Sequence, residues 1–145
     1  MRVVGLVLAG GLMAMAGAAQ AGGTAAAAGD WITQTGLAKV RIAPCGPALC
    51  GAVVWMKQPN DPQTGQPQID NKNPDPALRS RPALGLQIIK GMKPSGEGHW
   101  ADGTIYDPQS GKTYASRLTA NPDGTLKVEG CIAIFCQAQT WKPAN

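Results

Sequence analysis

The sequence predicts an all-β protein, an eight-stranded antiparallel up-and-down barrel. Short segments of alternating apolar and polar residues recur along the chain, and turns rich in Pro, Gly, Asn and Asp separate them. No stretch after the N-terminal segment keeps a helical periodicity. The segments follow one another without a long crossover apart from one central loop, which favours a barrel over a sandwich. A barrel of about eight strands has an interior that side chains fill or that holds one small ligand.

The N-terminus is predicted to be a cleaved signal peptide, residues 1–21. Arg2 precedes an apolar run, Val3–Ala18, and Ala19-Gln20-Ala21 offers a small-x-small cleavage site. A membrane anchor is the alternative, but the run is shorter than the roughly 20 residues that span a bilayer. We therefore expect a periplasmic or secreted protein with no membrane span after cleavage.

The mature chain is predicted to hold a disordered Ala/Gly-rich leader, residues 22–29, and a single barrel domain, residues 30–145. Cleavage removes Arg2 and leaves 12 basic and 9 acidic residues, a net charge of +3. No run of five like charges occurs, so nucleic acid is not an expected partner. An interaction with anionic polymer or lipid headgroups stays open, and the sequence predicts no oligomeric state.

Four cysteines form two pairs with the same spacing, Cys45–Cys50 and Cys131–Cys136. An even number of cysteines in an exported chain favours disulfides, and a hairpin at each pair would bring the two ends within bridging distance. A zinc site is the alternative, since four residues separate the members of each pair. However, the single histidine, His99, is near neither pair in the sequence. We expect two local disulfides, no metal and no cofactor.

The first half of the barrel is predicted to contain three strands, Trp31–Thr35, Ala38–Ala43 and Gly51–Lys57, with the first cysteine pair at a hairpin turn. A long loop, Gln58–Pro82, follows; its six prolines leave no room for a regular strand. Loops of about 25 residues are usually functional or disordered. Residues Pro76–Ser80 could form one helical turn, because Pro is tolerated at a first helical position.

Five strands are predicted after the loop, and turn sequences separate them. Pro, Asn, Asp and Gly occur in the connections at residues 91–96, 107–111 and 121–124, and the second cysteine pair supplies the last turn. The predicted strands are Leu84–Lys90, Gly98–Asp107, Lys112–Thr119, Thr125–Glu129 and Gln137–Lys142.

Several long motifs resemble one protein family. They are CGPALCGAVVWMKQP, DNKNPDPALRSRPALGL, W-x-x-G-T-I-Y-D-P-x-x-G-K-T-Y from Trp100 to Tyr114, and a final QTWK. With these motifs the chain is similar to the bacterial domain of unknown function 2147 family from Trp31 to Lys142. The resemblance implies an exported, lipocalin-like or streptavidin-like barrel without an established activity. It also implies that Trp31 and Trp141 plug one end under a cation, although Lys142 stands where many members have Arg.

The candidate ligand-binding residues gather around the central loop. Arg79 and Arg81 are two apart before a strand, so in an extended segment their side chains face the same way. A guanidinium could bind an anionic group of a ligand, with aromatic rings around its apolar body. The alternative is that these arginines pair with Asp75 or Asp107. The candidates are Arg79, Arg81, Trp55, Trp100, Tyr106 and Asp75.

Catalysis and cation binding have weaker support in the sequence. No activated nucleophile with a base is visible, because His99 is the single imidazole and the cysteines are expected to be oxidised. We therefore predict that the protein is not an enzyme, and no catalytic residues are assigned. The run Asp70–Asp75 is rich in side-chain oxygens, but Lys72 interrupts a calcium-loop pattern. We expect these side chains to bond local backbone amides.

Three functions are compatible with these observations. The first is an exported barrel that binds a small, partly apolar ligand, with the long loop as a lid. The alternative is a cell-envelope interaction module with a filled barrel, which acts through the 58–82 loop. The third is an enzyme that uses the carboxylates of Asp70, Asp75 and Asp107. An empty apolar interior would favour the first function, and a packed interior the second.

Overall fold

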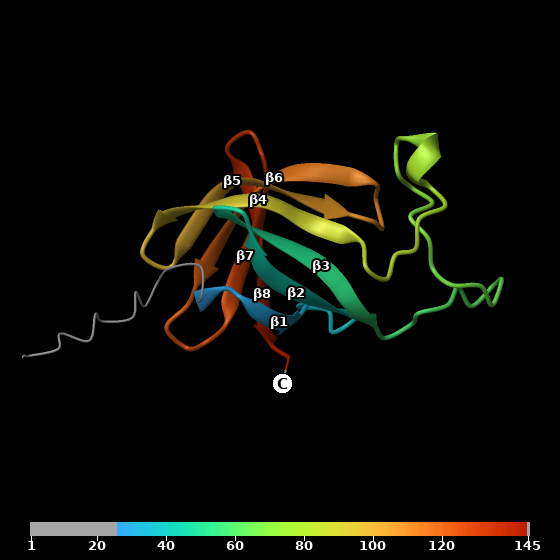
Figure 1. Cartoon of the computed structure of the whole chain (residues 1–145), viewed down its shortest axis with the longest axis horizontal. Helices are drawn as coiled ribbons and strands as arrows, with labels where there is room; N and C mark the ends of the chain where they lie inside the picture. The colour runs from blue at the N-terminus through green and yellow to red at the C-terminus, as the bar shows by residue number, and fades with distance from the viewer. Residues whose placement is uncertain (1–25, 145) are drawn as a thin grey trace, which may run out of the picture.

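The computed structural model describes residues 26–144, and in this part of the chain eight antiparallel strands close into a barrel (Figure 1). Each strand pairs with its neighbours in sequence order, and the last pairs with the first. This arrangement confirms the predicted fold class. The strands are β1 (Gly29–Ile32), β2 (Ala38–Cys45), β3 (Ala48–Met56), β4 (Gln87–Gly96), β5 (His99–Asp107), β6 (Lys112–Ala120), β7 (Leu126–Ile132) and β8 (Phe135–Pro143).

Alternation of side chains builds the wall of the barrel. In β2, Val40 and Ile42 are buried, whereas the intervening Arg41 is exposed. On the outside, Arg41 forms an ion pair of 2.7 Å with Asp30 of the neighbouring strand β1. Period-two alternation thus gives one apolar and one polar face.

Both predicted disulfides are present and account for all four cysteines of the sequence. Cys45 is bonded to Cys50 at the β2–β3 turn, and Cys131 to Cys136 at the β7–β8 turn. Cys131 and Cys136 lie directly opposite each other in the β7–β8 ladder, with their Cα atoms 4.0 Å apart. The disulfides indicate that the protein folds in an oxidising compartment.

The barrel interior is filled by large apolar side chains. Those that are less than 2% exposed include Trp100, Leu49, Met92, Leu118 and Leu126. Two glycines on strands make room for these neighbours. A Cβ atom at Gly51 would lie 3.2 Å from atoms of both Ile89 and Val40, and one at Gly103 would lie 2.5 Å from the Met92 sulfur. The middle of the barrel is therefore packed like an ordinary protein core.

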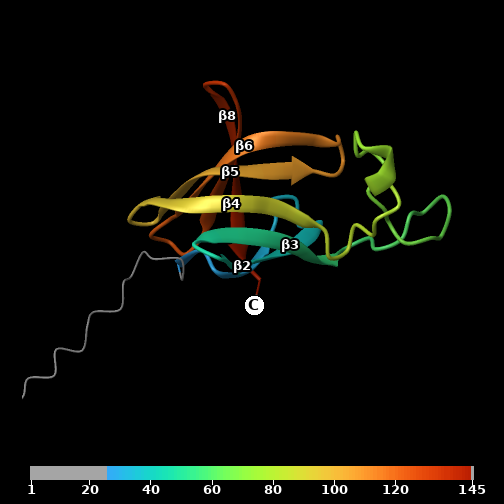
Figure 2. The same cartoon turned by 45° about the horizontal axis from the view of Figure 1, so that its top comes forward.

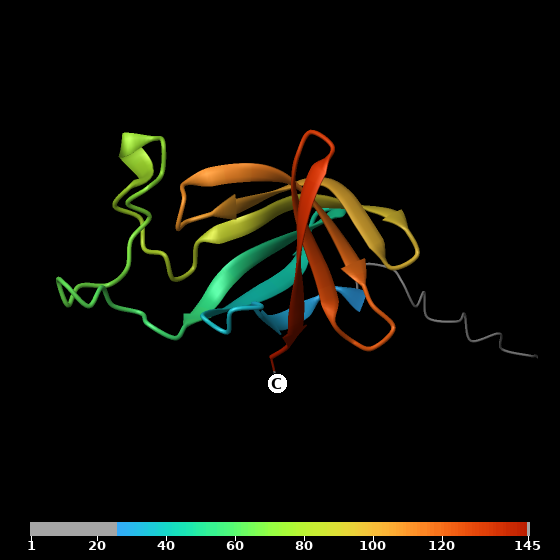
Figure 3. The same cartoon turned by 180° about the vertical axis from the view of Figure 1, so that it is seen from behind.

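The seam between β1 and β8 is the shortest in the barrel. Only two residue pairs join these strands, Trp31 with Pro143 and Ile32 with Lys142. The backbone N–H of Thr140 donates to Gln34 Oε1 at 2.8 Å just past the seam. The remainder of β8 extends with β7 beyond β1 as a projecting hairpin (Figure 3).

The chain enters the barrel earlier than expected. Ala27 is fully buried and its carbonyl oxygen accepts a hydrogen bond of 2.9 Å from Trp31 Nε1. The predicted leader, residues 22–29, therefore overlaps the barrel at its end. The predicted signal peptide, residues 1–21, lies outside the described residues. None of the helices within residues 26–144 is long and apolar enough to span a membrane.

The β4 strand differs most from its predicted bounds. It begins at Gln87 instead of Leu84 and continues to Gly96, through a segment predicted as a turn. Gly91 adopts a φ of +66°, so it bends the strand without ending it. Pro94 lies beyond Met92, the last β4 residue paired with β3, and a missing N–H is tolerated at such an edge position.

The long loop leaves one end of the barrel and returns to it, as Figures 1 and 2 show. Two isolated bridges shape it, Asn60 with Pro67 and Ile69 with Pro82. The predicted helical turn is present as a 3₁₀ helix, η2 (Pro76–Leu78). Asp75 caps this turn by accepting a hydrogen bond from the N–H of Ala77 at 3.0 Å.

Candidate functional site

A buried carboxylate, Asp70, organises the second half of the long loop. Asp70 has no exposed surface. Its side chain accepts three hydrogen bonds: from the Tyr106 hydroxyl at 2.5 Å, from Arg81 Nη2 at 2.8 Å, and from Asn73 Nδ2 at 2.9 Å. A buried carboxylate is stable only when it is paired and hydrogen-bonded, and this one is both. We call Asp70, Asn73, Arg81 and Tyr106 the anchor.

Backbone hydrogen bonds place the loop members of the anchor. The N–H of Asp70 donates to the Arg81 carbonyl at 2.9 Å, and the N–H of Asn73 donates to the Asp70 carbonyl at 3.1 Å. Asn73 Oδ1 also accepts from the N–H of Asp75 at 2.9 Å. The side chains of Asn73 and Asp75 therefore bond local backbone amides, as expected from their turn-forming chemistry, whereas the Asp70 carboxylate bonds side chains instead.

The anchor shifts the pKa values of both its acidic groups. Burial raises the pKa of Asp70, but the hydrogen bonds from Tyr106, Arg81 and Asn73 and the charge of Arg81 outweigh it, so the pKa lies below the ordinary value of 3.8. For Tyr106, burial and then the hydrogen bond to the Asp70 carboxylate raise the pKa to about 12. Asp70 is thus held ionised and Tyr106 protonated near neutral pH.

The anchor attaches the loop to the end of the barrel at the β5–β6 turn (Figures 1 and 2). The ring of Tyr106, near the end of β5, packs against the hydrophobic core, and its hydroxyl donates to Asp70. The β5–β6 turn fits closely against the same loop, since a Cβ atom at Gly111 would lie 2.0 Å from the Lys72 carbonyl oxygen. The second half of the loop is therefore held beside the β5–β6 turn.

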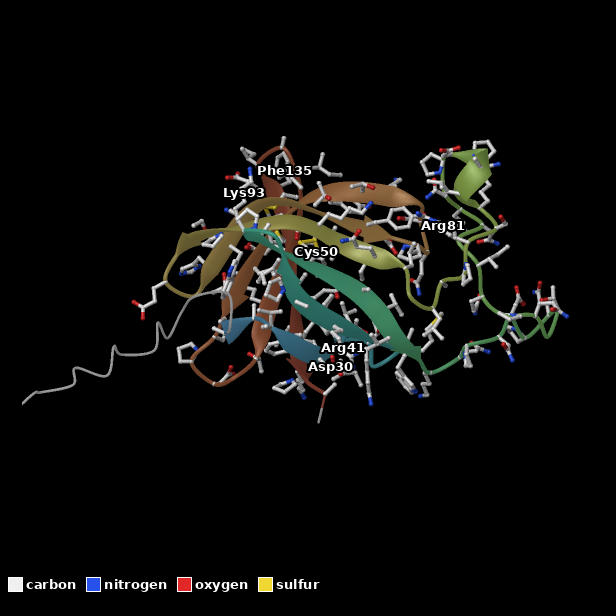
Figure 4. The ribbon with its side chains drawn as sticks, viewed as in Figure 1. Asp30, Arg41, Cys50, Arg81, Lys93 and Phe135 are labelled. Carbon is white, nitrogen blue, oxygen red and sulfur yellow. A yellow bond between two sulfur atoms is a disulfide. The ribbon has the colours of Figure 1, made fainter. Side chains whose placement is uncertain are left out.

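The structure separates the two arginines of the predicted site. Arg81 is an anchor residue, and in Figure 4 it lies at the end of the barrel that faces the loop. Its partner is Asp70, whereas the expected ion pair was with Asp75 or Asp107. Arg79 Nε instead donates to the Asn73 carbonyl at 2.7 Å, and Asp75 caps η2. The ion pair with Asp70 forms because the Ile69–Pro82 bridge brings the neighbouring residues together.

The predicted aromatic pocket is not assembled around these arginines. Trp55 is 39% exposed on the outer wall, where the Lys39 ammonium lies 5.0 Å from its ring centroid. A register shift between Lys39 and Val40 moves Trp55 to that face. Trp100 is 1% exposed inside the core. Of the three aromatic candidates, Tyr106 is the one that joins Arg81.

The plug tryptophans behave as the family resemblance implies, but the cation does not. Trp31 and Trp141 are both buried in the core. Lys142 is exposed beside them, and the cation–π contact formed by the described residues is the one between Lys39 and Trp55.

Two grooves lie on the surface near polar side chains. One, of about 420 Å³, lies over β5–β7 and is lined by His99, Arg117, Lys127 and Glu129 among others. The other, of about 480 Å³, lies between the β7–β8 turn and the bulge of β5, with Asp102 and Ile134 on its sides. No group of three His, Cys, Asp or Glu side chains suited to a metal ion occurs among residues 26–144.

Comparison with known proteins shows the family. A model described as "Uncharacterized protein conserved in bacteria (DUF2147)" matches residues 29–143. The chain belongs to this family. Comparison with curated proteins finds no match.

A solved structure confirms the fold class of this DUF2147 protein. It is protein HP1028 from the human pathogen Helicobacter pylori, described as belonging to the lipocalin family. The two chains superpose with a TM-score of 0.69 over 81% of this chain and 82% of the other, at 22% sequence identity. The similarity establishes a lipocalin-like barrel.

Sequence reasoning missed the anchor as a unit. Asp70 and Asn73 stood out as oxygen-rich loop residues, and Arg81 and Tyr106 as ligand candidates. The contact between Asp70 and Tyr106 spans 36 residues. The spacing gives no signal for such a contact, since it depends on how the loop folds back onto β5.

Proposed function

We propose that this protein is an exported interaction module of the cell envelope, in which the barrel is a filled scaffold and residues 58–82 carry the binding surface. The anchor is the observation that carries this proposal. A fully buried Asp70 with three side-chain donors fixes a long loop to a rigid wall. Binding residues are commonly presented in this way, on loops that a scaffold positions.

The packing of the barrel favours this function over a ligand carrier. Glycines 51 and 103 leave no space beside Ile89, Val40 and Met92. The anchored half of the loop lies at the end of the barrel beside the β5–β6 turn, where the anchor fixes it.

The anchored half of the loop presents both charge and apolar surface. Lys72 and Arg79 are exposed, and Arg79 uses its Nε for Asn73, which fixes the direction of its guanidinium. Ile69 and Leu84 are 44% and 53% exposed at the two ends of this segment. The complementary partner carries anionic groups beside an apolar surface.

Export supplies the compartment for such a role. The two disulfides are suited to an oxidising location. A periplasmic or secreted protein, released from the signal peptide at residues 1–21, meets envelope components directly.

A non-enzymatic role agrees with the uses of the carboxylates. Asp70 belongs to the anchor and Asp75 caps η2, while Asp107 accepts from the N–H of Gln109 at 3.0 Å and the Ser110 hydroxyl at 2.8 Å. Each of these carboxylates therefore already has hydrogen-bond partners that hold it in place. His99 Nδ1 lies 3.3 Å from the Thr119 hydroxyl, and no carboxylate of the described residues forms a hydrogen bond or ion pair with His99.

A small apolar ligand is the second candidate, because part of the inner wall is not fully covered. Ile105 and Tyr114 face inward but are only half-buried. A ligand here would contact the inner wall near the loop end of β5 and β6. Native mass spectrometry of the protein purified from its own compartment tests this candidate, since a retained small molecule would favour it over the interaction module.

Site-specific photo-cross-linking in cells tests the interaction module. A cross-linking amino acid at Ala77, exposed on η2, should give light-dependent adducts with a macromolecule. The same group at Pro122, on the turn at the opposite end of β6, is the matched control and should give none. Adding Arg79→Ala should weaken the Ala77 adduct. Equal adducts from both positions, or none from Ala77, would contradict the proposal.

A further inference from the structure

The β7–β8 turn carries the most exposed of the large apolar side chains on the described surface. Ile132 is 65% exposed, Ile134 87% and Phe135 77%. Together with Ala133 they form the end of the hairpin that projects from the barrel, seen clearly in Figure 3. We call residues 132–135 the apolar tip. Exposed apolar groups gathered in one place mark a contact site more often than isolated ones do.

The apolar tip is held in a fixed shape. The Cys131–Cys136 disulfide closes its base, and Ile132 pairs with Phe135 directly above it. The turn itself consists of Ala133 and Ile134, and Ala133 adopts a φ of +53°. Two-residue hairpin turns with positive φ favour Gly, Asn or Asp. The turn conformation therefore disfavours Ala at this position. No contact within the described barrel explains why the Ile134 and Phe135 side chains are exposed.

The small size of the tip indicates which kind of partner it can bind. The apolar tip has four residues, whereas a standard protein interface uses about 20–30 residues on each side. A hydrocarbon layer accepts a projecting apolar group without a matching pocket. Lipid is therefore the partner that this surface suits best.

Cations accompany the tip at its base. Arg117 Nη2 lies 3.1 Å from the Cys136 sulfur, and Arg117 is also 3.5 Å from Glu129. Lys93 pairs in the ladder with Ala101, which lines the same groove as Ile134. Asp102 is the acidic residue on this groove. Basic groups near an inserted apolar anchor strengthen attachment to anionic membranes.

We propose that the apolar tip inserts into the interfacial layer of a membrane containing anionic lipids and holds the barrel at its surface. Ile134 and Phe135 enter the acyl boundary, while Lys93 and Arg117 remain at the level of the headgroups. The role is independent of the loop surface, which lies on another part of the molecule, so one surface can hold the protein while the other binds.

Vesicle flotation with the mature, disulfide-bonded chain tests this proposal. Vesicles of phosphatidylcholine and phosphatidylglycerol should carry the wild-type protein upward, and pure phosphatidylcholine should carry less. Ile134→Ser combined with Phe135→Ser should lower the apparent affinity at least about tenfold, since most of the inserted apolar surface is lost. Leu37→Ser, which alters a residue that is 44% exposed just before β2, is the matched control and should bind as wild type does.

Folding and self-association are separated by two further measurements. Thermal melting should show the same Tm for wild type and the tip variants, because the altered side chains are exposed; Phe135→Ser on its own gives a milder second variant. Flotation of the tip variants equal to wild type would overturn the proposal. So would a wild-type dimer that Phe135→Ser converts to a monomer without any vesicle binding, because the tip would then be an interface between copies.

Discussion

At the scale of single residues, Asp70 shows how one buried charge is made stable. Its carboxylate accepts hydrogen bonds from Tyr106 of the barrel and from Asn73 and Arg81 of the loop. Removing one donor leaves a buried acceptor without its partner, which costs more than the net value of an ordinary hydrogen bond. The loop and the wall are therefore coupled through one side chain.

Tyr106→Phe should destabilise the protein, because it removes a donor from Asp70 with little change in shape. The expected loss is about 1–3 kcal/mol of the free energy of unfolding. Chemical denaturation of wild type and variant measures it. Tyr114→Phe is the control and should change stability little, since its hydroxyl has no hydrogen bond with another described side chain or backbone group. Equal stability of wild type and Tyr106→Phe would show that the anchor does not couple loop and barrel.

The pH dependence of stability follows from the lowered pKa of Asp70. A carboxylate whose folded pKa lies below its unfolded value stabilises the folded state above the unfolded pKa, about 3.8. That contribution should disappear as the pH falls from there through the folded pKa. The pKa values of Asp30 and Asp123 are also lowered, by hydrogen bonds from Arg41 and from Thr125 respectively, so wild type must be compared with Asp70→Asn.

Melting curves across this acid range should show a steeper loss of Tm in wild type than in Asp70→Asn.

At alkaline pH, Tyr106 makes stability fall as the pH rises, because its pKa is raised to about 12. Its contribution should be present below the ordinary value of 10.0 and be lost as the pH rises towards 12. The Tm difference between wild type and Tyr106→Phe should narrow over that interval.

At the scale of elements, the strands were predictable and their ends were less so. Alternation in residues such as Val40 and Ile42 is a local signal, and the structure confirms it. The Gly91–Gly96 segment carries turn residues, yet it continues β4 because β5 pairs along it through Lys93 and Pro94. Tertiary pairing therefore decided a boundary that local turn chemistry could not.

The two halves of the long loop should differ in hydrogen exchange. Residues 60–67 are tied together mainly by local bonds, such as the Asp61 N–H to the Gln66 carbonyl at 2.8 Å. Residues 70–82 are tied to the barrel by the anchor. Amides of the first half should exchange much faster, as expected for a segment with few buried contacts. Slow exchange across 60–67, equal to that of the strands, would contradict this prediction.

At the scale of the whole molecule, the sequence predicted the fold but not where the candidate ligand-binding residues lie in it. Period-two alternation and turn residues predict the strands that form the barrel wall. Whether Trp55 faces in or out depends on one register shift at Lys39, and the place of Arg81 depends on the Ile69–Pro82 bridge. Such features arise from the packing of distant segments, which local patterns do not encode.

The close approach of β4 to β5 makes a sharp prediction for Gly103. Its Cβ position lies 2.5 Å from both the Met92 sulfur and the Lys90 carbonyl oxygen, so Gly103→Ala forces the backbone of β4 to move. Overpacking of this kind costs about 1–3 kcal/mol of the free energy of unfolding. Gly96→Ala is the control, because its Cβ would meet His99 at an ordinary 3.8 Å. If Gly103→Ala were as stable as wild type, β4 and β5 would not approach each other at this point as closely as the structure shows.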